Sequence, residues 1–301
     1  MNCIETNNLT YKYSEQEVVV NNISLQVPEG CIYGFLGKNG AGKTTTLRLL
    51  LGLLKRQEGS IKIFNRSFDE NRIEILKQTG SLIESPSFYA HLSAKDNLKI
   101  LQKIYQCPTQ RIEEVLQVVG LAKAENKKVS QFSLGMKQRL SIGIAMLHNP
   151  KLLILDEPTN GLDPNGIIDI RELLKKINID LGTTIIVSSH LLSEIERLVT
   201  HIGIINKGSL LFQGTYTELK SMQNETSTIS FRTNDSAKAM DIVSSNNINV
   251  KLINDQIIIP FAENKIISKL NEQFVNNKIE VYQIKTQEKD LESIFIDLTN
   301  N

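Results

Sequence analysis

This 301-residue sequence lacks a long apolar run and an excess of one charge, and it has few cysteines. Its longest apolar stretch covers only a few residues around Leu49–Leu54, whereas a helix that crosses a bilayer needs about 20, so we expect no membrane span. The 34 Lys and Arg residues are balanced by 33 Asp and Glu residues, which leaves a formal net charge of +1. This balance excludes a global basic field, and we therefore expect no nucleic acid as a partner.

The three cysteines, Cys3, Cys31 and Cys107, are odd in number and lie far apart in the sequence. The first ten residues, MNCIETNNLT, have neither the positive region nor the apolar region of a signal peptide. Both observations favour a cytoplasmic protein whose thiols are reduced and serve as packing residues. Hydrophobic residues make up 41% of the chain, enough to bury a core, and the length accommodates two domains.

The first part of the chain has the pattern of strands followed by a loop and a helix. Alternating apolar residues over Ile4–Leu9, Val18–Val20 and Ile23–Val27 predict an antiparallel β layer. Cys31–Leu36 then indicates a short buried strand that enters a glycine-rich loop, and Thr45–Leu54 indicates an apolar helix. The order strand, loop and helix is that of an α/β fold.

Helical periodicity replaces strand alternation in the middle of this first domain. Ala94–Tyr105 and Thr109–Val119 predict two helices separated by Cys107 and Pro108, and a third helix is expected after Ser133. We assign residues 85–150 to a helical subdomain inserted between two strand-rich parts.

Two continuous apolar runs on either side of a helix follow this insertion. Runs without alternation are typical of central parallel strands that are covered on both faces, so the order predicts a βαβ unit in a mainly parallel core sheet. The three segments are Lys151–Leu155, Ile167–Ile179 and Thr183–Val187.

The composition changes after residue 220. Residues 221–227 are mostly polar and predict a linker between a larger α/β domain at 1–220 and a smaller α+β domain at 228–301. The smaller domain contains no chemical motif. Its expected elements are strand, helix, strand, strand, helix, strand and helix, over Thr228–Arg232, Ala237–Ser244, Val250–Ile253, Gln256–Pro260, Lys265–Phe274, Ile279–Lys285 and Asp290–Leu298.

Residues 37–44, GKNGAGKT, fit the P-loop pattern and have a strand before them and a helix after them. Glycines let successive backbone N–H groups turn around phosphate oxygens, and the helix N-terminus adds partial positive charge. Lys43 would reach the β and γ phosphates of ATP, and the Thr44 hydroxyl would ligate Mg²⁺. The nucleotide-binding candidates are Gly37, Lys38, Asn39, Gly40, Ala41, Gly42, Lys43, Thr44 and Thr45.

Two carboxylates end the apolar run before Pro158, at the sheet edge where open α/β folds bind ligands. Asp156 would hold Mg²⁺, and Glu157 would orient or deprotonate the water that attacks the γ-phosphate. The alternative is an ordinary acidic strand end, which the upstream P-loop disfavours. His190 follows the next apolar strand at the same edge and is a candidate sensor of the γ-phosphate, although a lone histidine is more often structural.

With these elements in this order, residues 1–220 resemble the ATP-binding subunit of an ATP-binding cassette (ABC) transporter. The segment FSLGMKQR at 132–139 is similar to the family's signature motif at the start of a helix. Ser133 can cap that helix, and its hydroxyl, the Gly135 amide and the helix N-terminus would form a second anion site. The family resemblance implies that this site closes on ATP bound to an opposite subunit, and therefore a homodimer. The segment departs from the common Leu-Ser-Gly-Gly-Gln form at three positions, Phe132, Leu134 and Met136.

The resemblance assigns roles to two further residues. Tyr13 corresponds to the aromatic residue that stacks on adenine; the alternative is a tyrosine of an early strand or turn. Asn160–Asp163 matches the D-loop, in which Asp163 helps to couple the two ATP sites across the dimer; the alternative is a simple turn before Pro164.

Glu84 stands where the family usually has a glutamine that contacts Mg²⁺ and the attacking water. A carboxylate binds a metal more strongly than an amide does and can accept a proton, so Glu84 is a candidate metal ligand and catalytic residue. A glutamate at this position, followed by Pro-Ser-Phe-Tyr, resembles the branch concerned with bacitracin resistance and lantibiotic immunity. The alternative is that the exchange is chemically tolerated.

The resemblance therefore implies the ATPase subunit of an exporter, with ATP and Mg²⁺ as cofactors and separate transmembrane permease subunits as partners. Without a span of its own, the chain would be peripheral on the inner face of the cell membrane through that permease. Two alternatives remain open at this point: a soluble ATPase of the same class that acts on ribosomes or nucleic acid, and a sensor-type ATPase without transport. The domain at 228–301 would regulate the protein, stabilise the dimer or serve as a spacer that contributes only solubility.

Overall fold

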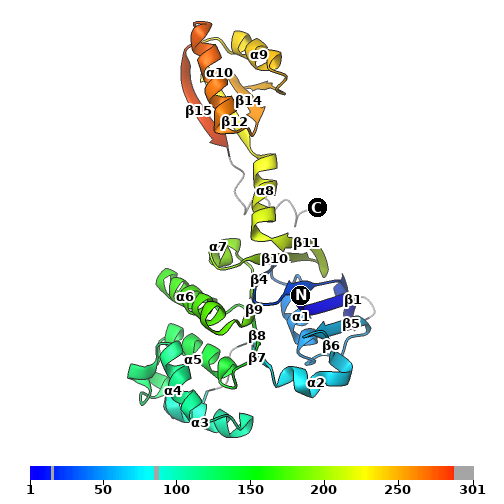
Figure 1. The fold of residues 1–301 in the computed structure, drawn as a ribbon, viewed down its shortest axis with the longest axis vertical. Coiled ribbons are helices and arrows are strands. Elements are labelled where there is room, and N and C mark those ends of the chain that lie inside the picture. Colours follow the sequence, from blue (N-terminus) through cyan, green and yellow to red (C-terminus); the bar gives the residue numbers. More distant parts are fainter. Residues whose placement is uncertain (15–16, 85–87, 288–301) are drawn as a thin grey trace. The chain divides into compact units, whose positions relative to one another are not determined.

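The computed structural model describes residues 1–14, 17–84 and 88–287, which form the ribbon of Figure 1. The chain divides into two compact units, Met1–Tyr216 and Thr217–Asn301. Each unit has its own hydrophobic core and is described by itself. In the described part of the chain, no helix combines the length and the apolar character needed to cross a membrane.

The first unit begins with an antiparallel sheet in the order β2-β1-β5-β6, with β3 also paired to β1. Ile4 of β1 lies opposite both Ile63 and Val27, and the buried side chains of this layer pack into the main core. The strands are β1 (Asn2–Ser14), β2 (Glu17–Ile23), β3 (Gln26–Pro28), β5 (Glu58–Ile63) and β6 (Arg66–Ser67).

The single strand predicted over Ile23–Val27 is wrong, because β2 ends at Ile23 and β3 begins only at Gln26. Between them the Leu25 N–H donates to the Thr6 hydroxyl at 2.7 Å, while the Thr6 N–H donates to the Leu25 carbonyl oxygen at 2.8 Å, so a side chain replaces one of the two backbone bonds there. Alternation of apolar residues continues across this break, which is why the sequence pattern did not reveal it.

The core sheet has the order β11-β10-β4-β9-β8-β7, and all its neighbouring strands are parallel except β10 and β11. Every residue of β4, β8 and β9 is buried, as expected for continuous apolar strands covered on both faces. The strands are β4 (Ile32–Leu36), β7 (Thr79–Leu82), β8 (Leu152–Leu155), β9 (Thr184–Ser189), β10 (His201–Asn206) and β11 (Ser209–Thr215).

Figure 1 shows the antiparallel layer with α1 and α2 on one side of this sheet and the helices α5 and α6 on the other. The helices are α1 (Lys43–Leu50), α2 (Phe68–Leu76), α5 (Leu134–Met146), α6 (Pro164–Leu181) and α7 (Leu192–Ile195). The predicted α/β architecture, an antiparallel layer beside a mainly parallel core sheet with flanking helices, is confirmed.

Helices α3 (Ala94–Tyr105), α4 (Gln110–Val118) and α5 lie together, with short 3₁₀ turns at Ala122–Ala124 and Val129–Gln131. The Ser93 hydroxyl caps α3 by accepting the Asp96 N–H at 3.1 Å. Buried residues from the three helices form their contact, among them Leu98, Ile112 and Leu140. These helices account for the helical periodicity that the sequence showed between the two strand-rich parts.

The second unit contains a sheet in the order β13-β14-β12-β15 with α9 and α10 packed on one face. Phe231 and Phe274 meet edge to face at its centre, with ring centroids 5.4 Å apart. The elements are β12 (Thr228–Thr233), α9 (Ser236–Ser245), β13 (Lys251–Ile253), β14 (Gln256–Pro260), α10 (Asn264–Asn276) and β15 (Val281–Gln287).

Helix α8 (Tyr216–Thr226) begins at the boundary between the two units. The segment 221–227 that the sequence predicted as a linker is therefore helical up to Thr226. The last predicted helix, Asp290–Leu298, lies outside the described residues.

Candidate functional site

The P-loop joins β4 to α1, and its backbone carbonyl groups contact the side chain of its own lysine. Lys43 Nζ donates to the carbonyl oxygen of Gly37 at 2.7 Å and to that of Lys38 at 3.3 Å. The ammonium group is nearly buried, with 5% of the side chain exposed, and it is held at the floor of the loop. The sequence folds this way because Gly42, which precedes α1, has φ of +105°, a conformation that glycine adopts easily.

Residues Gly37 and Gly42 allow the loop to approach neighbouring backbone. A Cβ at Gly42 would lie 2.5 Å from the Val19 carbonyl oxygen, and one at Gly37 would lie 2.5 Å from that of Ile205. By contrast, a Cβ at Gly40 would meet nothing within 4 Å, which leaves open space on the outer side of the loop. A hollow of about 270 Å³ is lined by Val19, Asn39, Gly40, residues 42–45 and Glu157. A glycine-rich loop at a helix N-terminus beside such a hollow fits a chain of phosphates.

Two of the other P-loop candidates line this hollow: Asn39, which is exposed, and Thr45, which is buried. Lys38 is exposed and Ala41 is buried, and neither of them lines it. All nine predicted P-loop residues are therefore brought together by a single turn of chain.

Asp156 lies at the carboxyl end of β8 and connects the P-loop helix to β9. Its Oδ2 accepts the Thr44 hydroxyl at 2.8 Å, and its Oδ1 accepts the Ser188 hydroxyl at 2.5 Å. A carboxylate beside a hydroxyl is a donor set that Mg²⁺ uses together with phosphate oxygens and water. The described residues hold no cluster of three or more His, Cys, Asp or Glu side chains that would suit a metal.

Glu157 adopts φ of +45°, which is uncommon for a residue other than glycine. Its N–H donates to the Ser188 hydroxyl at 2.9 Å, and this bond holds the backbone in place. Its Oε1 lies 3.4 Å from Lys43 Nζ, and its Oε2 lies 3.0 Å from His190 Nδ1. The structure thus brings Lys43, Asp156, Glu157 and His190 together at one edge of the sheet.

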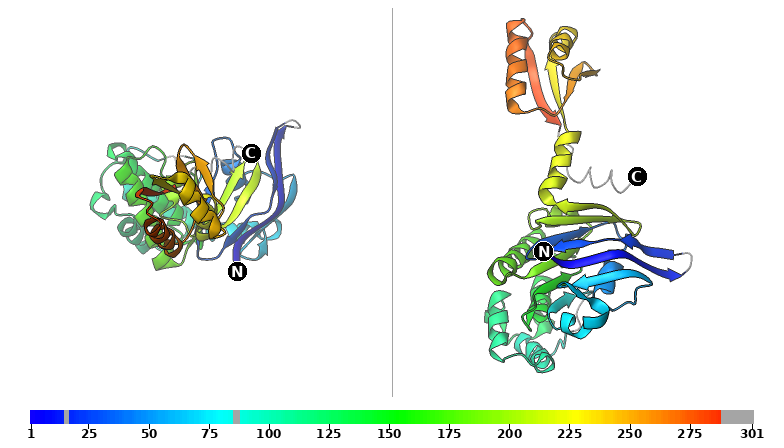
Figure 2. Two further views of the ribbon diagram at one scale, coloured as in Figure 1. Left: turned by 90° about the horizontal axis from the view of Figure 1, so that it is seen from above. Right: turned by 45° about the vertical axis from the view of Figure 1, so that its right-hand side comes forward.

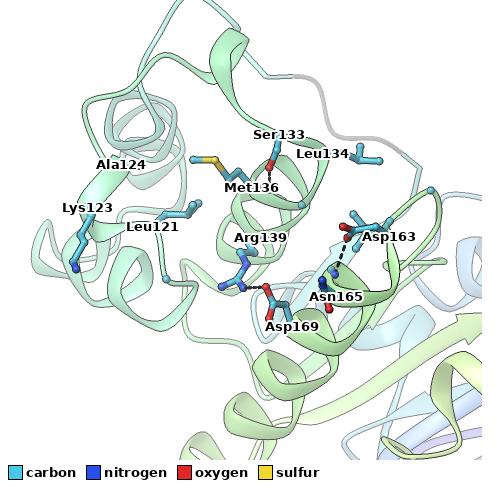
Figure 3. A pocket seen from close by; sticks show the side chains of 15 residues that line it. Leu121, Lys123, Ala124, Ser133, Leu134, Met136, Arg139, Asp163, Asn165 and Asp169 are labelled. Carbon is cyan, nitrogen blue, oxygen red and sulfur yellow. Dashed lines mark hydrogen bonds and ion pairs between the residues drawn. The ribbon is translucent and has the colours of Figure 1, made fainter.

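Ser133 and Asp163 lie at a different cavity, of about 700 Å³ (Figure 3). The Ser133 hydroxyl caps α5 by accepting the Met136 N–H at 3.3 Å, and Asp163 caps α6 by accepting the Gly166 N–H at 2.8 Å. Gly135 also lines this cavity, which shares no lining residue with the hollow at the P-loop. Within one chain, the signature segment and the P-loop therefore form separate sites.

The cavity beside the signature segment extends to an ion pair between α5 and α6. Arg139 and Asp169 approach to 2.6 Å, and Figure 3 shows this pair on the side of the cavity away from Leu134. The pair joins the helix that starts at Ser133 to the helix that starts at Asp163.

Glu84 is not among the side chains that meet at Asp156. Its carboxylate forms an ion pair with Arg48 of α1, and 67% of its side chain is exposed. Among the described residues, no hydrogen bond joins Glu84 to Thr44 or Asp156, so in this structure the carboxylate lies beside the site rather than in it.

Tyr13 lies near the end of β1. Its side chain is 51% exposed, and its ring meets that of Tyr11 edge to face with centroids 5.1 Å apart. An exposed aromatic face that a neighbour holds in place is suited to stacking.

Three residues without an assigned role in the sequence also contribute to the site. Ser188 links Asp156 to the Glu157 backbone, and Arg48 pairs with Glu84. The Glu194 carboxylate lies 2.9 Å from the hydroxyls of Thr159 and Ser189, and so connects the loop after β8 with the end of β9. Ser188 could have been found from the sequence, because it belongs to the run Ser-Ser-His at residues 188–190. The partners of Arg48 and Glu194 depend on tertiary structure.

Comparison with known proteins gives a consistent set of similarities. Residues 20–160 match the family model described as ABC transporter. The chain is 45% identical over 299 residues to the bacitracin transport ATP-binding protein BcrA of Bacillus licheniformis, a match that covers 98% of this chain and 96% of that protein. It is 41% identical over 213 residues to the lantibiotic transport ATP-binding protein SrtF of Streptococcus pyogenes, covering 71% of this chain and 91% of that protein.

Among solved structures, the chain is similar to CbiO1 from Clostridium perfringens, which is part of the ABC transporter complex CbiONQ. The TM-score is 0.68 at 26% sequence identity, and the match covers 73% of this chain and 91% of that chain.

Proposed function

Because the chain belongs to the ABC transporter family as an ATP-binding subunit with ATPase activity, we propose that it powers the export of bacitracin or a related peptide antibiotic. The observation that carries the mechanism is the group Lys43, Asp156, Glu157 and His190 at the P-loop. The observation that carries the substrate class is the similarity to the bacitracin relative, which extends through both units of the chain. The match to the lantibiotic relative covers only 71% of the chain.

ATP binding would begin with a change of partner at Lys43. The ammonium group now faces two carbonyl oxygens and the Glu157 carboxylate. Phosphate oxygens are stronger partners for an ammonium ion than a carboxylate at 3.4 Å, since they allow short charge-assisted hydrogen bonds. Glu157 Oε1 would then be released toward the phosphate hollow.

The released Glu157 carboxylate would accept a proton from the water that attacks the γ-phosphate. Its other oxygen remains hydrogen-bonded to His190 Nδ1, which fixes its direction. A protonated His190 donates from both ring nitrogens, so Nε2 is available to a γ-phosphate oxygen. His190 would therefore report the presence of that phosphate to the catalytic carboxylate.

Thr44 and Asp156 would hold Mg²⁺ together with the phosphates. The ion would neutralise charge on the phosphate oxygens during transfer. The existing bond between Thr44 and Asp156 supports this role, because both ligands already lie within 2.8 Å of each other. Glu84 would join this group as a further ligand or as the residue that orients the water, and Tyr13 would stack on adenine.

Catalysis would take place in a homodimer. Ser133, Gly135 and Asp163 line a cavity that is separate from the P-loop of their own chain, so they are available to the ATP of an opposite subunit. The capped N-terminus of α5 would face the γ-phosphate there. The unit Thr217–Asn301 would stabilise this dimer.

Movement of the dimer would be transmitted to separate transmembrane permease subunits, which would keep this chain on the inner face of the cell membrane. The alternative of a ribosome- or nucleic-acid-directed ATPase has no support in these similarities. Within the described residues, the insertion between the P-loop and Asp156 is the compact group α3 to α5.

The test is to express the chain with the multispanning proteins encoded beside it in a sensitive host, and to measure growth inhibition by bacitracin and by a lantibiotic. We expect resistance to bacitracin that Glu157→Gln abolishes. Resistance to the lantibiotic alone would contradict bacitracin export and indicate that the exported substrate is a lantibiotic. Unchanged sensitivity to both, with the ATPase active, would contradict the proposed export function.

A further inference from the structure

The Glu84 carboxylate has a specific partner, the guanidinium group of Arg48 on α1. Arg48 is 30% exposed and Glu84 is 67% exposed, so the pair lies at the surface beside the site. Arg48 follows Thr44 by four residues, which places both side chains on one face of α1, about one turn of 5.4 Å apart. The carboxylate is therefore paired at Arg48, about one helical turn from the hydroxyl proposed to ligate Mg²⁺, and not at that hydroxyl.

The backbone two residues before Glu84 is hydrogen-bonded to Asp156, one of the metal candidates. Leu82 ends β7, and its carbonyl oxygen accepts the Asp156 N–H at 2.8 Å. Glu84 lies only two residues later, so its main chain cannot move far from Asp156. Its φ of +64° is unfavourable for a residue with a side chain, which favours a change of conformation once the partner is lost. A short movement of backbone and side chain would suffice to change partners.

We propose that Arg48 is a positioning residue that holds the Glu84 carboxylate away from Thr44 and Asp156 until ATP and its metal ion bind. This inference rests on the proposed role of Glu84 at the metal. One carboxylate cannot serve the guanidinium and the metal fully at the same time, so binding of either partner weakens binding of the other. Arg48 thereby sets how much metal is needed to recruit Glu84.

A glutamine at position 84 would not be controlled in this way. An uncharged amide forms no ion pair with a guanidinium group, so the competition depends on the carboxylate. The exchange from the family's usual glutamine to Glu84 and the presence of Arg48 one turn after Thr44 thus form one functional unit.

The test is a double-mutant cycle on the full chain that carries Glu157→Gln, which is expected to bind ATP with little hydrolysis. The probe is Mn²⁺, and its affinity for the ATP complex is measured from the spin-resonance signal of the free ion. Arg48→Gln should tighten Mn²⁺ binding about two- to fivefold, because an exposed ion pair of ordinary strength is lost. In a Glu84→Gln background, the same change should have a clearly smaller effect.

Two controls separate this competition from the loss of a nearby positive charge. Arg48→Lys keeps the charge and should remain close to the parent protein. Arg56→Gln removes a guanidinium group that pairs with Asp69 rather than with Glu84, and it should leave the Mn²⁺ affinity unchanged.

The outcomes distinguish the inference from the proposed role of Glu84. If Glu84→Gln weakens Mn²⁺ binding but Arg48→Gln has no effect, or an equal effect in both backgrounds, the inference alone is contradicted. If Glu84→Gln leaves Mn²⁺ affinity unchanged, both the metal role of Glu84 and the inference are contradicted. The ATPase assignment is tested separately through Glu157.

Discussion

Replacing Ser188 by alanine should destabilise the ATPase unit although it removes only one oxygen atom. The Ser188 side chain is fully buried, with an exposed fraction of 0%. Its hydroxyl accepts the Glu157 N–H at 2.9 Å and donates to Asp156 Oδ1 at 2.5 Å. Alanine leaves both groups without this partner at the edge of the sheet.

The size of the effect follows from these two bonds. An N–H left without a partner away from water costs about 1–3 kcal/mol, and loss of a hydrogen bond to a carboxylate costs a similar amount. Asp156 keeps its bond to Thr44, so we expect a total loss of about 2–4 kcal/mol of unfolding free energy. For a unit of this size, this corresponds to a decrease of about 5–15 °C in Tm.

The assay is thermal unfolding of the nucleotide-free protein, followed by circular dichroism, for the wild type and two alanine variants. Ser141→Ala is the matched control, because Ser141 is also buried but bonds only to the Lys137 carbonyl of its own helix. Alanine favours a helix, so this control should change Tm by no more than about 2 °C. If Ser188→Ala behaved like Ser141→Ala, the view that Ser188 connects the two carboxylate residues would be refuted.

Three further predictions concern the site and the thiols. Glu194→Gln should lower kcat about tenfold with little change in KM, because a neutral amide holds the hydroxyl groups of the two loops less firmly; steady-state ATPase kinetics would show this, and an unchanged kcat would contradict it. Tyr13→Ala should weaken ATP binding about tenfold while Tyr13→Phe keeps it, as fluorescence titration would show; equal weakening by both would argue against stacking. Burial raises the pKa of Cys3 to about 11 and that of Cys31 to about 12, so at pH 8 Cys107 should react first with a thiol reagent. Rapid labelling of all three cysteines would contradict the burial of Cys3 and Cys31. Above pH about 8.5 these two thiols ionise in the unfolded protein but stay protonated in the folded protein, so their contribution to the free energy of unfolding falls as pH rises.

Much of the fold was predictable because each core element carries a local signal. The apolar runs that became β8 and β9 have no alternation, and Ala94–Tyr105 has a strong helical period with Ser93 as its cap. The break after Ile23 was not predictable, because it depends on a bond from Leu25 to Thr6, a residue almost twenty positions away.

The candidate site likewise has residues that the sequence predicts and contacts that it does not. The P-loop, Asp156 and Glu157 are recognisable from spacing, since strand ends and glycines dictate where these groups lie. The partner of Glu84 was not predictable from sequence, because the contact with Arg48 joins the segment after β7 to the last turn of α1. Local pattern thus indicates which groups are present, whereas their pairing depends on the packed structure.

The most direct test of the account concerns Glu157. The measurement compares ATP binding, ATP-dependent dimer formation and ATP turnover in the wild type and in Glu157→Gln. The account predicts that the variant binds ATP, accumulates as an ATP-bound dimer and hydrolyses ATP at least about 100-fold more slowly, since the group that accepts the proton of the attacking water is lost. Hydrolysis by Glu157→Gln at the wild-type rate would contradict the central claim that this carboxylate activates the water.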